Sequence, residues 1–121
     1  VELACETDFV ARKDAFKNLA HELAMQVAAI NPTYVSAEEV PEDVKAKEKE
    51  IYKEQLKNEG KPEAMLEKIA EGKLQKFYEE MCLLNQPFFK DEKKTVQDLI
   101  TEAVTQLGEN IRINRFVRLS M

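Results

Sequence analysis

The chain has 121 residues, of which 44% are hydrophobic and 34% are charged, and its formal net charge is −5. This length corresponds to about one domain. Three glycines are too few for the many turns of an all-β sandwich, whereas high charge with few glycines and prolines favours long solvated helices. No apolar run reaches the roughly 18 residues of a membrane span, so we expect no membrane partner. The acidic net charge argues against direct nucleic-acid binding.

The N-terminal part of the chain is expected to form a strand and then a helix. Residues 1–5 alternate apolar and polar side chains, which predicts a short strand. Thr7 and Asp8 are both good helix N-caps, and they precede an amphipathic helix expected over 9–30. The side chains of its predicted buried stripe are three and four residues apart: Phe16, Leu19, Ala20, Leu23, Val27 and Ile30.

Residues 42–80 differ from the rest of the chain in charge. Of the 18 basic and 23 acidic residues of the chain, nine and eleven lie in this stretch, with both signs interleaved. Gly60 suits the position just after a helix, and Pro62 suits the first turn of the next one. We therefore expect an antiparallel helical hairpin, paired like a short coiled coil, that is inserted into a core α+β domain of residues 1–41 and 81–121.

The C-terminal part is expected to form a third buried helix and a final strand. Thr95 has the position of an N-cap, and Gly108 ends the helix. Apolar side chains then alternate with mostly polar ones over 111–119, at Ile111, Ile113, Val117 and Leu119. The strands at the two chain ends either pair with each other under the helices or join a third strand upstream. The predicted fold class is α+β, a small antiparallel sheet packed against helices.

Residues suited to catalysis or metal binding are scarce. His21 is the single histidine and is expected to face solvent, and the chain has no glycine-rich phosphate loop. Cys5 and Cys82 do not form a CxxC motif, and we interpret them as reduced thiols. A thiol redox protein is an alternative that needs an exposed thiol with a lowered pKa. The sequence thus predicts no catalytic residue, no metal site and no cofactor, and favours a binding protein over an enzyme.

The most unusual segment is the start of the first helix, where Thr7, Asp8, Phe9 and Val10 follow one another. In a continuous helix Phe9 lies about 20° from Phe16, which would make it a core or staple side chain. If the helix begins at or after Phe9, the stripe no longer fixes the direction of the ring. A rigid helix tip would then present an aromatic side chain and an acid, which suits a wedge inserted into a partner.

Three segments of the chain resemble one protein family. Residues 1–11, VELACETDFVA, are similar to the signature of bacterial elongation factor Ts. Residues 82–91, CLLNQPFFKD, resemble that family's LLEQPFVKD segment, with Asn85 in place of glutamate and Phe89 in place of valine. Residues 107–111, LGENI, also fit the family. The chain therefore resembles the core and dimerisation region of a short member with a single core repeat, without the N-terminal helical module and the strand before residue 1.

The resemblance implies a guanine-nucleotide exchange factor for the translational GTPase elongation factor Tu, acting in the cytoplasm. In this family the helix tip contacts the GTPase near its Mg²⁺ site. By resemblance, Phe9 would insert between side chains of elongation factor Tu, and Asp8 would act beside it. Thr7 would support the tip as a cap, and Val10 would support it by packing. Exchange of this kind needs no cofactor.

The resemblance also implies a homodimer, because short members of the family are dimers. We expect the interface to use the apolar side of the last strand, formed by Ile111, Ile113, Val117 and Leu119. The alternative function is a non-enzymatic helical scaffold or chaperone-like module that binds its partners through the charged hairpin at 42–80.

Overall fold

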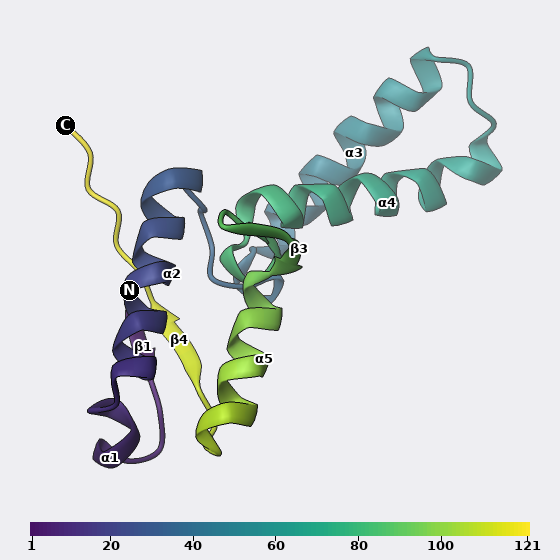
Figure 1. Cartoon of the computed structure of the whole chain (residues 1–121). Helices are drawn as coiled ribbons and strands as arrows, with labels where there is room; N and C mark the ends of the chain where they lie inside the picture. Colours follow the sequence, from purple (N-terminus) through teal and green to yellow (C-terminus); the bar gives the residue numbers. More distant parts are fainter.

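The two terminal strands of the chain pair with each other. The computed structural model describes all 121 residues, and in it β1 (Glu2–Ala4) runs antiparallel to β4 (Arg112–Arg115). Helices α2 (Asp14–Ile30) and α5 (Val96–Leu107) pack against this two-stranded sheet (Figure 1). The predicted α+β class is confirmed, and the direct pairing is the arrangement that the terminal strands adopt.

Side-chain alternation gives this sheet one apolar and one polar face. Leu3 pairs with Ile113, which is buried, while Ala4 pairs with Arg112, which is exposed. The register shifts by one residue between Glu2 and Leu3, so that Asn114 is the extra residue of a β-bulge. Because alternate side chains point to opposite faces, the helices cover the face of Ile113 and solvent meets the face of Arg112.

One hydrophobic core joins the sheet to the helices. Leu23 of α2 and Val96 of α5 are fully buried in it. Of the stripe predicted for α2, four residues belong to this core, whereas Ala20 is only partly buried and Ile30 is exposed. Leu83, from the short helix η2 (Leu83–Asn85), is also fully buried in it. The buried members of this core are Val10, Phe16, Leu19, Leu23, Val27, Val35, Leu83, Val96, Ile100, Ile111 and Ile113.

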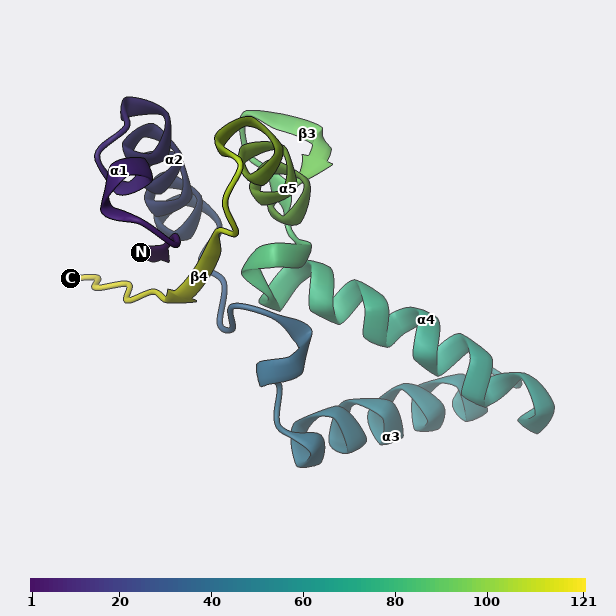
Figure 2. The same ribbon diagram turned by 90° about the horizontal axis from the view of Figure 1, so that it is seen from below.

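The charged segment forms the antiparallel helical pair that the sequence predicts. Helices α3 (Glu42–Asn58) and α4 (Glu63–Met81) project from the body, with their connecting loop far from both termini (Figures 1 and 2). Gly60 lies in the left-handed region with φ of 79°, and its N–H donates to the carbonyl of Lys57 at 3.0 Å. Glycine therefore closes α3 as expected. None of the helices combines the length and apolar character needed to cross a bilayer.

The two hairpin helices are held together by a thin apolar seam and by ion pairs. Leu56 of α3 and Leu66 and Ala70 of α4 are buried. The Nζ atom of Lys49 in α3 lies 2.7 Å from Oε1 of Glu67 in α4. Hydrogen bonds from Lys49 and Lys53 lower the pKa of the Glu67 carboxyl to about 2. Such exposed pairs contribute little individually. Coiled-coil packing in the strict sense, and the division into a core of 1–41 and 81–121 with an inserted hairpin, stay predictions.

A second small sheet lies between α4 and α5, where no strand is expected from the sequence. Strand β2 (Pro87–Phe88) pairs antiparallel with β3 (Asp91–Thr95). The buried side chain of Gln26 in α2 holds this sheet, because it donates to the carbonyl of Pro87 at 3.1 Å and accepts from the N–H of Phe89 at 2.8 Å. Strand β2 has only two residues, and four of the five residues of β3 are charged. Neither strand therefore shows the alternation of apolar and polar residues from which a strand is predicted.

The last strand is shorter than predicted, and its four apolar residues do not form one face. The expectation of a strand over 111–119 is wrong beyond Arg115, where β4 ends. Ile111 and Ile113 are buried in the core of this chain, whereas Val117 and Leu119 are 70% and 90% exposed. Of the four residues expected at a dimer interface, only Val117 and Leu119 are therefore accessible to a second copy of the chain.

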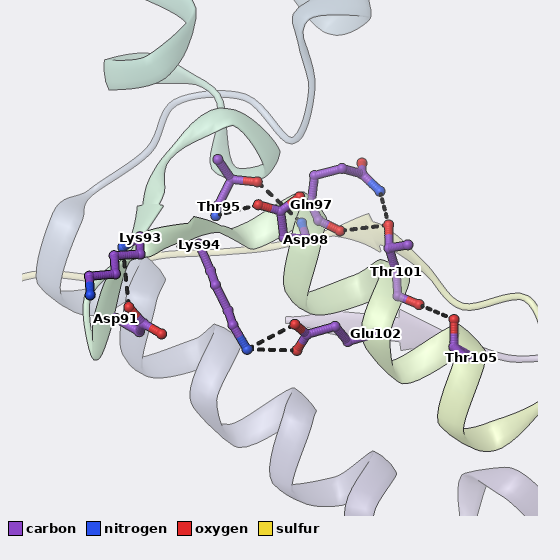
Figure 3. Close-up of polar contacts among 9 residues, drawn as sticks. All are labelled: Asp91, Lys93, Lys94, Thr95, Gln97, Asp98, Thr101, Glu102 and Thr105. Carbon is purple, nitrogen blue, oxygen red and sulfur yellow. Dashed lines mark hydrogen bonds and ion pairs between the residues drawn. The ribbon is translucent and has the colours of Figure 1, made fainter.

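The predicted cap of α5 is a complete capping box. The Thr95 hydroxyl accepts from the N–H of Asp98, and the Asp98 carboxylate accepts from the N–H of Thr95, both at 3.1 Å (Figure 3). Farther along the same helix, the exposed Thr105 hydroxyl donates to the carbonyl of Thr101 at 3.1 Å. The two threonines thus differ in role: one satisfies a free N–H at the helix start, and the other adds a bond to a carbonyl that is already used by the helix.

These roles predict effects of different size for the same substitution. Thr95→Ala is expected to lower the free energy of unfolding by about 1 kcal/mol because the Asp98 N–H loses its acceptor. Thr105→Ala is expected to leave it within about 0.5 kcal/mol, since alanine has the higher helix propensity. Urea denaturation of both variants tests this, and equal losses at the two positions would contradict it.

Candidate functional site

The first helix is broken, and the break determines the direction of Phe9. The expectation of one continuous helix over 9–30 is wrong: α1 (Asp8–Ala11) ends after one turn, and α2 begins at Asp14. Between them Lys13 adopts an extended conformation, with φ of −67° and ψ of 140°. The helical axis is therefore interrupted, and the angular relation between Phe9 and Phe16 expected for an ideal helix does not apply.

Competition between Val10 and Phe9 for the core accounts for the break. In an uninterrupted helix Val10 would point about 120° away from Phe16, while Phe9 would point within about 20° of it. In the structure Val10 is 2% exposed and belongs to the same core as Phe16, and Phe9 is 73% exposed. The break therefore brings Val10 into the core and turns the Phe9 ring out to solvent.

The exposed ring of Phe9 lies on a well-defined helix tip. The Nζ atom of Lys13 is 4.9 Å from the centre of the ring, a cation–π contact that limits where the ring can turn. Asp8 is exposed next to it and is the first residue of α1. The structure thus has the second of the two arrangements considered from the sequence, an aromatic side chain that projects beside an acid.

Thr7 caps this tip and is itself held by a residue from the other end of the chain. The Thr7 hydroxyl accepts from the N–H of Val10 at 3.4 Å and donates to Oε2 of Glu109 at 2.6 Å. Oε1 of Glu109 accepts from the N–H groups of Glu6 and Thr7, at 3.1 and 3.0 Å. The hydrogen bond from the Thr7 side chain is the main reason that the pKa of Glu109 lies below its ordinary value of 4.5.

Glu109 was not among the residues that the sequence predicts for the site. It follows Gly108, which ends α5 in the left-handed conformation with φ of 74° and turns the chain toward β4. Because β4 pairs with β1, the loop before β4 lies next to the loop after β1. The contact between Thr7 and Glu109, which are 102 positions apart, therefore depends on the antiparallel pairing of the chain ends. This pairing is the feature of the sequence from which the contact could have been inferred.

The predicted tip and the charged hairpin lie at opposite ends of the molecule. Residues Thr7, Asp8, Phe9 and Val10 are together in and before α1, as the sequence predicts. The hairpin loop is at the far end of α3 and α4 in both views (Figures 1 and 2). A partner that contacts the tip therefore meets a surface distinct from the hairpin.

The two thiols lie in different environments. Cys82 is fully buried, and this burial raises the pKa of its thiol. Cys5 is partly buried, and its Sγ donates to the carbonyl of Thr7 at 3.2 Å. A raised pKa disfavours the reactive thiolate. His21 is exposed on α2 as expected, and no group of three or more His, Cys, Asp or Glu side chains is arranged to hold a metal ion.

The opposite environments of Phe9 and Val10 lead to a prediction about stability. Phe9→Ala is expected to change the free energy of unfolding by less than about 0.5 kcal/mol, because the ring is mostly in solvent. Val10→Ala is expected to lower it by about 1–3 kcal/mol, because it leaves a cavity in the core. Urea denaturation measures both, and a larger loss for Phe9→Ala would show that the ring packs inward.

Comparison with known proteins places the whole chain in one family. The sequence model described as Elongation factor TS matches residues 17–121. Elongation factor Ts of Thermodesulfovibrio yellowstonii is 57% identical over 121 residues, which are 100% of this chain and 60% of that protein. Elongation factor Ts of Moorella thermoacetica is 60% identical over 118 residues, 98% of this chain and 58% of that protein.

A third relative also covers the helix tip. Elongation factor Ts of Thermosipho melanesiensis is 56% identical over 121 residues, 100% of this chain and 62% of that protein. Two of these alignments thus include Thr7–Val10, which precede the residues matched by the sequence model. The chain spans about 60% of the length of these relatives. From this agreement over nearly its entire length, the chain belongs to the elongation factor Ts family.

Proposed function

We propose that this protein promotes the release of GDP from elongation factor Tu, and that the tip of α1 is the part that acts on the GTPase. Membership of the elongation factor Ts family supports the partner. The observation that carries the role of the tip is the 73% exposure of Phe9 on a helix whose next residue, Val10, is buried. This proposal also places the protein in the cytoplasm, where translation elongation takes place.

The proposed mechanism is the insertion of Phe9 between side chains of elongation factor Tu near its Mg²⁺ site. Asp8 acts beside the ring, Thr7 caps the helix and Val10 fixes it to the core. Insertion shifts the elements of the GTPase that hold Mg²⁺ and the phosphates. If the factor binds the nucleotide-poor GTPase more tightly, linkage requires that nucleotide affinity falls by the same factor. No covalent bond changes, so the protein acts as a binding factor without a cofactor of its own.

The order of the tip before binding strengthens this proposal. Val10 packs in the core on one side of α1, and Thr7 and its neighbours are hydrogen-bonded on the other. A side chain on a preorganised element loses little conformational entropy when it binds. An aromatic residue in that position has the properties of an interface hot spot.

The proposal predicts a specific defect for Phe9→Ala. In the full-length protein this change is expected to slow the stimulated release of a fluorescent GDP analogue from elongation factor Tu by about ten-fold or more, because a hot-spot side chain is removed. Stopped-flow fluorescence measures the rate. Met65→Ala is the control, because Met65 is also apolar and exposed but lies on the hairpin.

Release as fast as wild type with Phe9→Ala would contradict the proposed role of the tip. The scaffold alternative makes the reverse prediction, since it requires changes on the hairpin, and not Phe9→Ala, to abolish partner binding.

We also propose that the protein forms a homodimer through Val117 and Leu119. Both are large apolar side chains exposed just after β4, and burying them against a second copy removes apolar surface from water. In sedimentation velocity at high micromolar concentration, wild type is expected to be a dimer, and the double variant Val117→Ser with Leu119→Ser is expected to be largely monomeric. A monomeric wild type would overturn this proposal.

A further inference from the structure

We propose that Glu109 is a positioning residue that holds the exchange tip in its active orientation. This inference rests on the proposed function of Phe9, and it assigns a role to a residue outside the tip segment. One carboxylate accepts three hydrogen bonds from the loop before α1, from the N–H of Glu6, the N–H of Thr7 and the Thr7 hydroxyl, at 3.1, 3.0 and 2.6 Å.

The carboxylate fixes the Thr7 hydroxyl in the state that caps α1. A hydroxyl has one proton to donate and two lone pairs to accept with. Because Thr7 donates its proton to Glu109 at 2.6 Å, its oxygen is left to accept from the N–H of Val10 at 3.4 Å. Glu109 therefore orients the cap as well as the backbone, and the cap in turn holds the residue that anchors Phe9 to the core.

A helix as short as α1 needs such support from outside. It has only four residues, and an isolated helix shorter than about 12 residues is not stable in water. Val10 supplies an apolar anchor on the side of the core. The contacts of Glu109 supply the polar anchor on the side of the loop, and together these two anchors determine the direction of the Phe9 ring.

Glu109 lies in the short connection between α5 and β4. It lies between Gly108, which ends α5, and Ile111, which is buried in the core next to β4. The neighbouring charges are compatible with an ionised carboxylate, because Lys13 contributes a favourable charge and the three donors contact the carboxylate directly. The tip is thus connected to α5 and to the sheet by side-chain chemistry and not only by the chain.

Two variants of Glu109 distinguish the effect of its hydrogen bonds from the effect of its side-chain size. Glu109→Ala removes all three acceptor contacts. Glu109→Gln retains one amide oxygen, which can still accept from the two N–H groups that now share Oε1, and its amide can donate to Thr7. Glu102→Ala is the matched control, because Glu102 is an exposed carboxylate on α5 whose Oε1 lies 2.8 Å from Nζ of Lys94 (Figure 3). Its hydrogen-bond partner is Lys94 and not the loop before α1.

Two readouts on the full-length protein test the proposal independently. Amide hydrogen exchange at Glu6, Thr7 and Val10 is expected to be about ten-fold or more faster in Glu109→Ala, because hydrogen bonds to a charged group are lost. It should be near wild type in Glu109→Gln and in the Glu102→Ala control. Stimulated GDP release is expected to fall about five-fold or more in Glu109→Ala and to be largely restored in Glu109→Gln. Urea denaturation identifies any variant whose fold is lost.

Each outcome has one meaning. Faster exchange limited to the tip, together with slow release that Glu109→Gln restores, supports the positioning role. Unchanged protection of the tip amides in a folded Glu109→Ala overturns it. Normal GDP release in Glu109→Ala, while Phe9→Ala is slow, also overturns it. If Phe9→Ala itself releases GDP normally, the proposed function fails, and the amide exchange alone decides whether Glu109 holds the tip.

Discussion

The burial of Val10 is the constraint on which the geometry of the tip depends. In a single straight α-helix, Val10 and Phe16 would point about 120° apart, so the two side chains would not face the same part of the core. The chain resolves this conflict with an extended residue, Lys13, between two helices. Once Val10 is inside, its neighbour Phe9 is outside, because adjacent residues on one turn point in different directions. The exposed aromatic ring is therefore a direct consequence of how the core is packed.

Much of the fold follows from local patterns in the sequence. The hairpin was predictable because charge is dense in 42–80 and because Gly60 and Pro62 mark its turn, and the structure places α3 and α4 on either side of them. The cap of α5 was predictable because Thr95 and Asp98 have the spacing of a capping box, and both of its hydrogen bonds form. These features depend on contacts between residues close together in the chain.

The features that escaped prediction depend on contacts between distant residues. No glycine or proline marks Arg12 and Lys13 as a break, so the direction of Phe9 stayed open until the packing of Val10 was known. Glu109 contacts Thr7 only because the chain ends pair, and its identity as a carboxylate gives no local indication of this. The alternation at Ile111 suggested a face for a second subunit, whereas in the structure this side chain packs in the core of its own chain.

The exposure of Phe9 also leaves free energy that a partner of the proposed tip can use. The core keeps Val10 and leaves the Phe9 ring 73% exposed, so most of the free energy available from burying a phenylalanine, about 1.5–3 kcal/mol, is not used in folding. A partner that covers the ring can gain that free energy. Because hydrogen bonds and core packing already order the helix that carries the ring, little of this gain is lost to conformational entropy on binding. In the proposed function, one exposed side chain can in this way act on a partner, provided that the packing of its own chain keeps that side chain exposed.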